Sequence, residues 1–100
     1  MKLFALIYTM VDIDESNRRR PEHVAFLADL VRSGRIECGW KFPHYEVGAL
    51  QGILFCRAET ADEVRGWFAL DPVILAGART IDVREALPMS VGVEPAPSGS

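Results

Sequence analysis

The chain has 100 residues, the length of one compact domain with a modest core. Its net charge is −3 and its only basic cluster is Arg18–Arg20, which argues against a general nucleic-acid binder. No apolar run approaches the roughly 20 residues of a membrane span, and the apolar N-terminus is too short for a signal peptide. We therefore expect a cytoplasmic protein without a membrane or nucleic-acid partner.

A strand, a loop and a helix are predicted in the first third of the chain. Residues 2–10 are apolar at both odd and even positions, which predicts a strand covered on both faces. Residues 11–20 are polar and charged and predict a loop. Pro21 suits the first turn of a helix because its missing N–H is not needed there. We expect this helix to run to about Ser33 and to stop at Gly34.

The face of this helix that we expect to be buried carries a histidine. At about 100° per residue, His23, Leu27 and Leu30 fall almost on one line. A buried imidazole costs free energy unless it has a partner, and with a partner and a cavity it is suited to proton transfer near neutral pH. The alternative is a core histidine whose ring nitrogens are satisfied internally. The apolar residues flanking the line are Val24, Phe26 and Val31.

Two further strands are predicted on either side of a loop at residues 43–48. Residues 35–42 alternate and predict a half-buried strand, whereas residues 49–58 are apolar on both faces. The spacing of Cys38 and Cys56 fits no metal site, so both are expected to be buried thiols and neither a nucleophile. The residues expected on the inward side of the first of these strands are Ile36, Cys38, Trp40 and Phe42.

The second helix begins with a capping box at Thr60–Glu63. Its buried stripe, continued at the helical period, reaches Asp71. Asp71 also precedes a proline and is a standard N-cap for a short following helix, which is the structural alternative to a functional role. The two roles are compatible. The members of the stripe before Asp71 are Val64, Trp67 and Phe68.

The C-terminal part is predicted to hold a short helix at residues 73–76 and a last strand at residues 79–86, with Ile81 and Val83 facing inward. Residues 88–100 are rich in Pro, Gly and Ser and predict a loose tail. Residues 1–87 then form the domain.

The order of elements is β-α-β-β-α-β, a ferredoxin-like α+β fold with a four-stranded antiparallel sheet and two helices on one face. Two strands are apolar on both faces, so the other sheet face needs cover, and a homodimer through that face is expected. Both helices lie on the same side of such a sheet, so His23 and Asp71 can meet. Asp71 would then hold one imidazole nitrogen while the other serves as general base or acid.

Three segments together resemble the YciI-like (YCII-related) family over roughly residues 2–87. The resemblance implies a dimer of the dimeric α/β-barrel superfamily and a His–Asp dyad as active site, which corresponds to His23 and Asp71. It also implies cofactor-independent chemistry, because a similar small enzyme removes chloride from a chlorinated hydroxyhydroquinone and other relatives are isomerases or monooxygenases. The three segments are Arg20–Leu27, Gly34–Ile36 and Asp71–Gly77.

The chain departs from the family at residues 40–45, which are bulky and aromatic, so we expect the substrate region to differ. Arg20 is a candidate for binding an anionic substrate, with a solvated loop position as the alternative. For the aromatic candidates the alternative is packing in the core, and for His44 it is a position on the loop surface. The predicted substrate-binding residues are Arg20, Tyr8, Trp40, Phe42, His44 and Trp67.

We weigh three functions. The first is a small cofactor-independent enzyme of the isomerase, lyase or dehydrochlorinase type, in which His23 moves a proton on a small cyclic or aromatic metabolite and Asp71 holds the imidazole. The second is a non-catalytic small-molecule-binding or accessory dimeric module whose His–Asp pair is structural. The third, a purely structural dimerisation domain, gives His23 no role. The sequence has no zinc signature or phosphate loop, and neither a metal nor a cofactor is expected.

Overall fold

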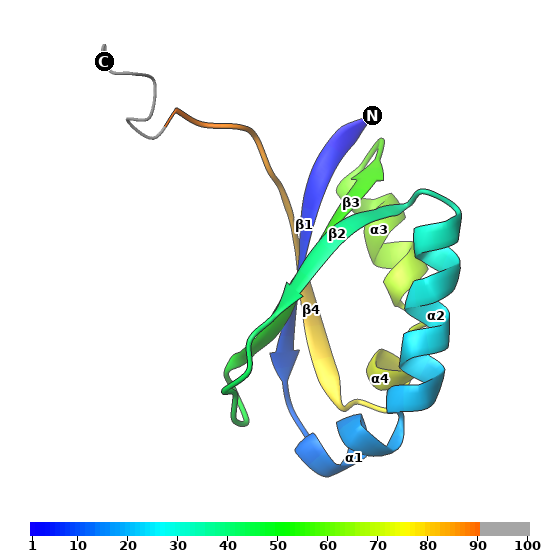
Figure 1. The fold of residues 1–100 in the computed structure, drawn as a ribbon, viewed down its shortest axis with the longest axis vertical. Coiled ribbons are helices and arrows are strands. Elements are labelled where there is room, and N and C mark those ends of the chain that lie inside the picture. Colours follow the sequence, from blue (N-terminus) through cyan, green and yellow to red (C-terminus); the bar gives the residue numbers. More distant parts are fainter. Residues whose placement is uncertain (91–100) are drawn as a thin grey trace.

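The structure, a computed structural model, describes residues 1–90 (Figure 1). Within that range the helices and strands follow the predicted β-α-β-β-α-β order, with two short helices besides the two long ones. The short helix near residues 73–76 was predicted, whereas the one at Ile13–Arg18 was not. None of the helices in residues 1–90 is long and apolar enough to cross a membrane. The elements are β1 (Lys2–Met10), α1 (Ile13–Arg18), α2 (Arg20–Arg32), β2 (Ile36–Lys41), β3 (Leu50–Ala58), α3 (Ala61–Phe68), α4 (Pro72–Leu75) and β4 (Arg79–Glu85).

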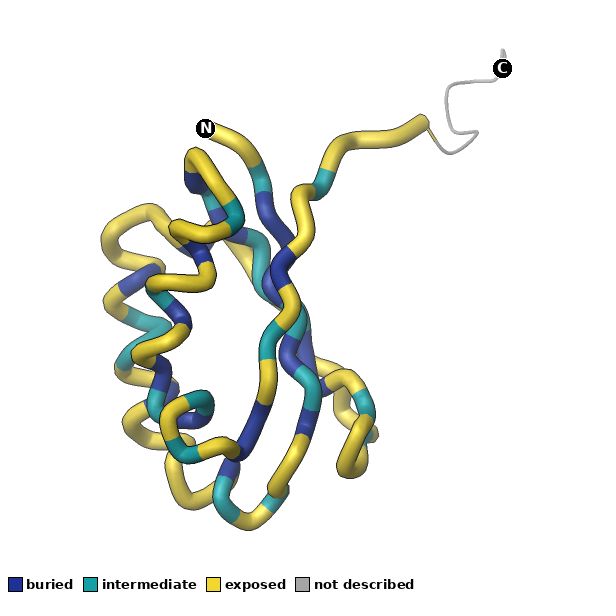
Figure 2. The backbone as a smooth tube through the Cα atoms, turned by 180° about the vertical axis from the view of Figure 1, so that it is seen from behind, coloured by how far each residue is buried: buried dark blue, intermediate teal, exposed yellow. Residues whose placement is uncertain are grey.

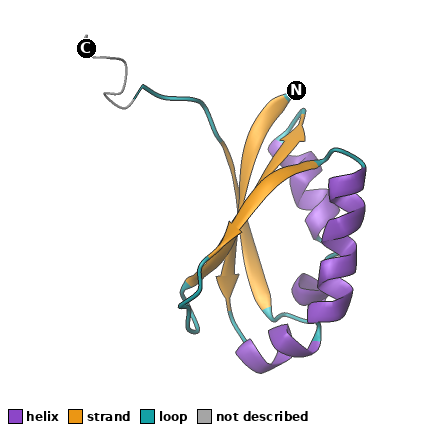
Figure 3. Ribbon diagram, in the orientation of Figure 1, coloured by secondary structure: helices purple, strands orange, loops and turns teal. Residues whose placement is uncertain are grey.

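The strands form one antiparallel sheet in the order β2-β3-β1-β4. Figure 3 shows the helices on one side of this sheet. This is the ferredoxin-like α+β arrangement expected from the sequence, so the fold prediction is confirmed. The predicted tail, residues 88–100, lies outside the described residues from position 91 onward.

The core lies between the sheet and the helices (Figure 2). Strand pairing places Leu6 of β1 opposite Leu54 of β3 and Val83 of β4, so these three residues share the helix-facing side. Val64 and Phe68 of α3 are fully buried against this side, as their predicted stripe requires. The other face of the sheet is the open face, which within residues 1–90 no helix covers. Its apolar residues are Leu3, Ala5, Ile7, Ile53 and Phe55.

A β-bulge between Ile36 and Cys38 changes the course of β2. The extra residue keeps Ile36 buried but turns Cys38 and Trp40 to the open face, where Trp40 is 61% exposed. The prediction that Ile36, Cys38, Trp40 and Phe42 share one inward side is therefore wrong. The prediction of a buried Cys38 is wrong for the same reason, whereas Cys56 is buried as expected. Beyond the bulge, Gly39 and Lys41 occupy the helix-facing positions.

The segment before the first long helix is another correction, because the loop predicted at residues 11–20 contains α1. The Asp12 side chain accepts the N–H of Glu15 at 3.0 Å and caps the helix. Glu15 in turn pairs with Arg18 and, at 2.9 Å, with Arg19. This short helix carries the buried Ser16, whose hydroxyl accepts a hydrogen bond from Arg79.

The two long helices begin and end as their sequence signals predict. Pro21 lies in the first turn of α2, and Gly34 follows its end with a φ of 79°, a left-handed conformation that glycine adopts without strain. The Thr60 hydroxyl accepts the N–H of Glu63 at 3.2 Å at the start of α3. α2 is buried along His23 and Leu30.

Candidate active site

A buried histidine–aspartate pair joins α2 to the start of α4. His23 is one turn into α2 on its sheet-facing side, with 6% of its surface exposed, and Asp71 is fully buried. The Nδ1 atom of His23 lies 2.9 Å from Oδ1 and 3.1 Å from Oδ2 of Asp71. The two residues that the helical period singled out, 48 positions apart, are therefore in contact.

The Asp71 carboxylate accepts two further hydrogen bonds. The Tyr8 hydroxyl of β1 donates to Oδ2 at 2.5 Å, and the backbone N–H of Val73 donates to Oδ1 at 3.2 Å. The Val73 bond is the N-cap of α4, so Asp71 caps a helix and orients His23 at once. A carboxylate that only accepts satisfies all of these donors, whereas a protonated carboxyl would compete with them.

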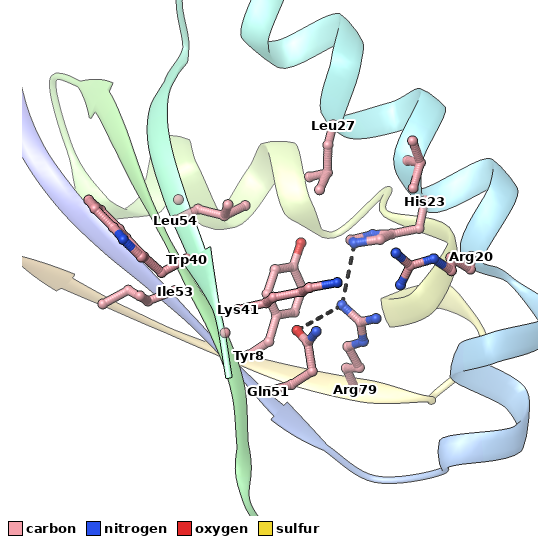
Figure 4. Close-up of a pocket in the computed structure, with 13 residues that line it drawn as sticks. Tyr8, Arg20, His23, Leu27, Trp40, Lys41, Gln51, Ile53, Leu54 and Arg79 are labelled. Carbon is pink, nitrogen blue, oxygen red and sulfur yellow. Dashed lines mark hydrogen bonds between the residues drawn. The ribbon is translucent and has the colours of Figure 1, made fainter. Parts of the chain in front are cut away.

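This arrangement decides which nitrogen of His23 carries the proton. Nδ1 must donate to the carboxylate, which leaves Nε2 with a lone pair. The Nη1 group of Arg79, which can only donate, lies 3.3 Å from Nε2 and fits that assignment (Figure 4). The neutral imidazole thus presents a hydrogen-bond acceptor on the side away from Asp71.

Arg79 is itself an unusual residue for the interior, because its guanidinium is buried with 4% of the residue exposed. Its Nε donates to the hydroxyl of Ser16 at 2.9 Å, and Nη1 donates to the side-chain oxygen of Gln51 at 3.0 Å. Its Cζ lies 5.2 Å from the centre of the Tyr8 ring, a cation–π distance. Burial lowers the pKa of Arg79, while the neighbouring Tyr8 and Asp71 act in the opposite direction.

A cavity of about 300 Å³ opens beside His23, between α2 and the strands β2 and β3. Polar groups gather at one end and aliphatic side chains such as Leu27 and Leu54 at the other (Figure 4). The described residues contain no cluster of three His, Cys, Asp or Glu side chains that could share a metal ion. The cavity is lined by Tyr8, Arg20, His23, Val24, Leu27, Gly39, Trp40, Lys41, Gln51, Gly52, Ile53, Leu54 and Arg79.

Two glycines leave room on the strand side of this cavity. Gly39 and Gly52 occupy helix-facing positions on β2 and β3, where other strand residues carry side chains. A Cβ atom at Gly52 would lie 2.8 Å from the carbonyl oxygen of Trp40, so the close approach of the two strands also requires glycine there.

Comparison with known proteins identifies the family of the chain and a solved structure with the same fold. The sequence model of the YCII-related domain family matches residues 1–88. The chain belongs to the YCII-related domain family. Among curated protein sequences, none matches the chain. Among solved structures, the chain is similar to 5-chloro-2-hydroxyhydroquinone dehydrochlorinase from Burkholderia phenoliruptrix AC1100, solved in complex with 2,5-dihydroxybenzoquinone. The identity is 24% and the TM-score 0.61, over 84% of this chain and 93% of the other, which shows a shared fold.

The predicted substrate-binding residues of this YCII-related protein divide into two groups. Tyr8 and Arg20 line the cavity beside His23. Trp40 borders it but directs its ring away from the cavity (Figure 4). The ring lies on the open face and packs edge-on against Phe55. The other three lie elsewhere: Phe42 follows the end of β2, His44 lines a separate surface hollow, and Trp67 packs on the core beneath Arg35.

Three polar residues of the cavity were missed from the sequence, namely Arg79, Gln51 and Lys41. Arg79 had a usable signal, because it lies two positions before the inward-facing Ile81 and so shares its side of β4. Lys41 and Gln51 had none, because a bulge in β2 and a register shift between β1 and β3 set which way they face.

We expect the Tyr8 phenol to make stability fall in alkali. Burial, followed by the charge of Asp71 and the hydrogen bond to it, raises the pKa of Tyr8 above its ordinary value of 10.0. Above pH ~10 the unfolded chain therefore loses a proton that the folded chain keeps, and the free energy of unfolding falls by up to ~1.4 kcal/mol per pH unit from this group. Urea denaturation between pH 8 and 11 should show a shallower fall in Tyr8→Phe than in the wild type.

Cys56 contributes equally to both proteins in this comparison. Burial raises the pKa of its thiol from 9.0 to about 12, so its effect begins about one pH unit lower and cancels in the difference. Identical pH slopes for Tyr8→Phe and wild type would contradict the buried Tyr8–Asp71 hydrogen bond.

Proposed function

We propose that this YCII-related protein is a small cofactor-independent enzyme in which His23 transfers a proton on a compact ligand bound in the cavity. The observation that carries the proposal is the buried His23–Asp71 pair, whose second ring nitrogen, Nε2, faces that cavity. A positioned base with an orienting carboxylate is the arrangement that general acid–base catalysis requires.

In the proposed reaction, Nε2 accepts a proton from an acidic C–H or O–H group of the ligand. The imidazolium that forms is stabilised by Asp71, which is held by Tyr8 and by the N–H of Val73. The electron pair left on the ligand moves into a neighbouring carbonyl to give an enolate, or expels a leaving group such as chloride. Return of the proton to another atom of the ligand completes an isomerisation, and its loss to water completes an elimination.

The ligand class follows from the size and polarity of the cavity. A volume of about 300 Å³ is at the lower end for small-molecule sites, which favours a single ring over a larger cofactor. An aliphatic wall formed by Leu27 and Leu54, opposite polar groups at the other end, suits a ring that carries oxygen atoms. The similar solved structure, a dehydrochlorinase with a bound quinone, is consistent with this class.

A cytoplasmic location, expected from the sequence, remains a prediction.

One observation favours the alternative, a non-catalytic binding or accessory module. The lone pair of Nε2 already faces an N–H of Arg79 at 3.3 Å, so both ring nitrogens have protein partners. In a module of this kind the pair would link α2 to α4 and β4 as a structural element. Turnover separates the two functions.

His23→Gln tests the proposed catalytic role directly. Glutamine is polar and similar in size to histidine, but it cannot accept and return a proton near neutral pH. We expect the wild type to convert at least one member of a panel of chlorinated hydroxyhydroquinones and unsaturated ring lactones. Conversion is measured by chloride release and by mass spectrometry of the products. The variant should be at least ~100-fold slower. The matched control is His44→Gln, which changes the other histidine, outside the cavity, and should leave the rate unchanged.

Equal turnover by His23→Gln and wild type would contradict the proposal that His23 is the catalytic base. Binding of panel compounds without turnover in the wild type, with binding lost in His23→Gln, would instead establish the module.

We further propose that the protein is a homodimer joined through its open face. This face carries Leu3, Ile7 and Phe55 without a covering helix in residues 1–90, and the bulge in β2 adds the exposed Trp40. Contiguous apolar surface of this kind is typical of protein interfaces.

Sedimentation velocity tests the dimer with Phe55→Asp, which introduces a charge in the middle of the open face. We expect two-chain particles for the wild type and single chains for the variant, with an unchanged far-UV circular dichroism spectrum. Val31→Asp, on the exposed side of α2, is the matched control and should stay dimeric. A wild type that sediments as a single chain at all concentrations would rule out the dimer.

A further inference from the structure

Arg79 is a buried cation without an acidic partner. The arginine–carboxylate ion pairs within residues 1–90 all involve other arginines. The hydrogen-bond partners of the Arg79 guanidinium are neutral: a hydroxyl, an amide oxygen and an imidazole. Its Nη2 group donates no hydrogen bond to a described residue. A buried charge costs free energy unless an opposite charge compensates it. A negatively charged group bound next to Arg79 would therefore be stabilised there.

The Asp71 carboxylate does not compensate the charge of Arg79 directly. Its two oxygens accept from Tyr8, His23 and Val73, and the imidazole of His23 lies between it and Arg79 in the chain of hydrogen bonds. The negative charge of Asp71 therefore supports the imidazole, and the guanidinium on the other side of the ring faces the cavity.

The cavity gathers further positive charge although the whole chain has a net charge of −3. Arg20 of α2 and Lys41 of β2 line it with Arg79, and their side chains approach from different sides (Figure 4). None of the described residues that line the cavity is acidic. Such a cavity attracts a small anion and disfavours a cation or a neutral ligand of the same shape.

We propose that the ligand of this cavity is a compact organic anion, a ring carboxylate or an ionised enol or phenol, whose charged oxygen binds Arg79. Arg20 and Lys41 add longer-range attraction, and the aliphatic wall at Leu27 and Leu54 takes the ring. This inference rests on the proposed function only in assigning the ligand to the same cavity, and it adds the chemical class that the cavity selects.

The position of Arg79 also gives the anion a place in the chemistry. Because Nη1 lies 3.3 Å from Nε2 of His23, an oxygen bound to the guanidinium is held next to the base. The oxygen would replace the imidazole as acceptor for Nη1 and so free the lone pair of Nε2. Negative charge that builds on the ligand when its proton leaves would be stabilised by the same guanidinium.

The test compares anions with neutral compounds of the same shape, and it uses the full chain. Isothermal titration calorimetry at low salt measures two pairs of probes, benzoate with benzamide and cyclopentanecarboxylate with its amide. We expect at least one anion to bind tenfold or more tightly than its amide, with backbone NMR shifts at Gln51 and Leu27. Arg79→Gln should lose about 10- to 100-fold of the affinity for that anion and little for the amide.

Arg65→Gln is the matched control, because it removes an exposed arginine of α3 that pairs with Asp62 and does not line the cavity, and it should leave the preference intact. Arg79→Lys covers the case in which Arg79→Gln does not fold: it keeps the charge without the planar fork, and a weakened but remaining preference for the anion is expected.

Equal binding of acid and amide in both pairs, or no saturable binding by either anion, would overturn the inference. So would an unchanged preference in Arg79→Gln. None of these results depends on turnover, so the anion site can fail while His23 remains catalytic, and the reverse outcome is equally distinguishable.

Discussion

The carboxylate of Asp71 is the constraint on which the site depends. It accepts hydrogen bonds from Tyr8 on β1, from His23 on α2 and from the first turn of α4, and thereby joins elements separated by up to 63 residues of sequence. Because all three donors converge on two oxygens, the ring of His23 has one orientation and one tautomer. A single buried residue thus serves both the packing of the helices and the state of the base.

The electrostatics of the cavity follow from that tautomer. With its proton on Nδ1, His23 presents Nε2 to Arg79, and the guanidinium is held by Ser16 and Gln51 without a carboxylate of its own. A fold optimised for stability alone would pair or remove such a charge. The buried charge of Arg79 lies beside a cavity with two glycines on its strand side. A ligand that neutralises this charge explains its presence better than packing does.

Much of this arrangement could be predicted from the sequence because it depends on helical period and local capping. The period aligned His23 with Leu27 and carried the buried stripe of the second helix to Asp71. Strand registers were less accessible. The bulge after Ile36 turned Trp40 to the open face, because one extra residue reverses every following side chain and leaves no mark in the apolar pattern. The prediction of a loop before Pro21 missed α1, although Asp12 and Glu15 have the spacing of a capped helix start.

Asp71 and Arg79 together hold His23 as a neutral imidazole with its proton on Nδ1 and its lone pair facing the cavity. Long-range ¹H–¹⁵N NMR of the uniformly labelled protein at pH 8 measures this directly, with His44 as an internal comparison. We expect a protonated Nδ1 and an unprotonated Nε2 for His23, and a loss of this preference in Asp71→Asn. A wild-type spectrum in which His23 carries its proton on Nε2 would contradict it.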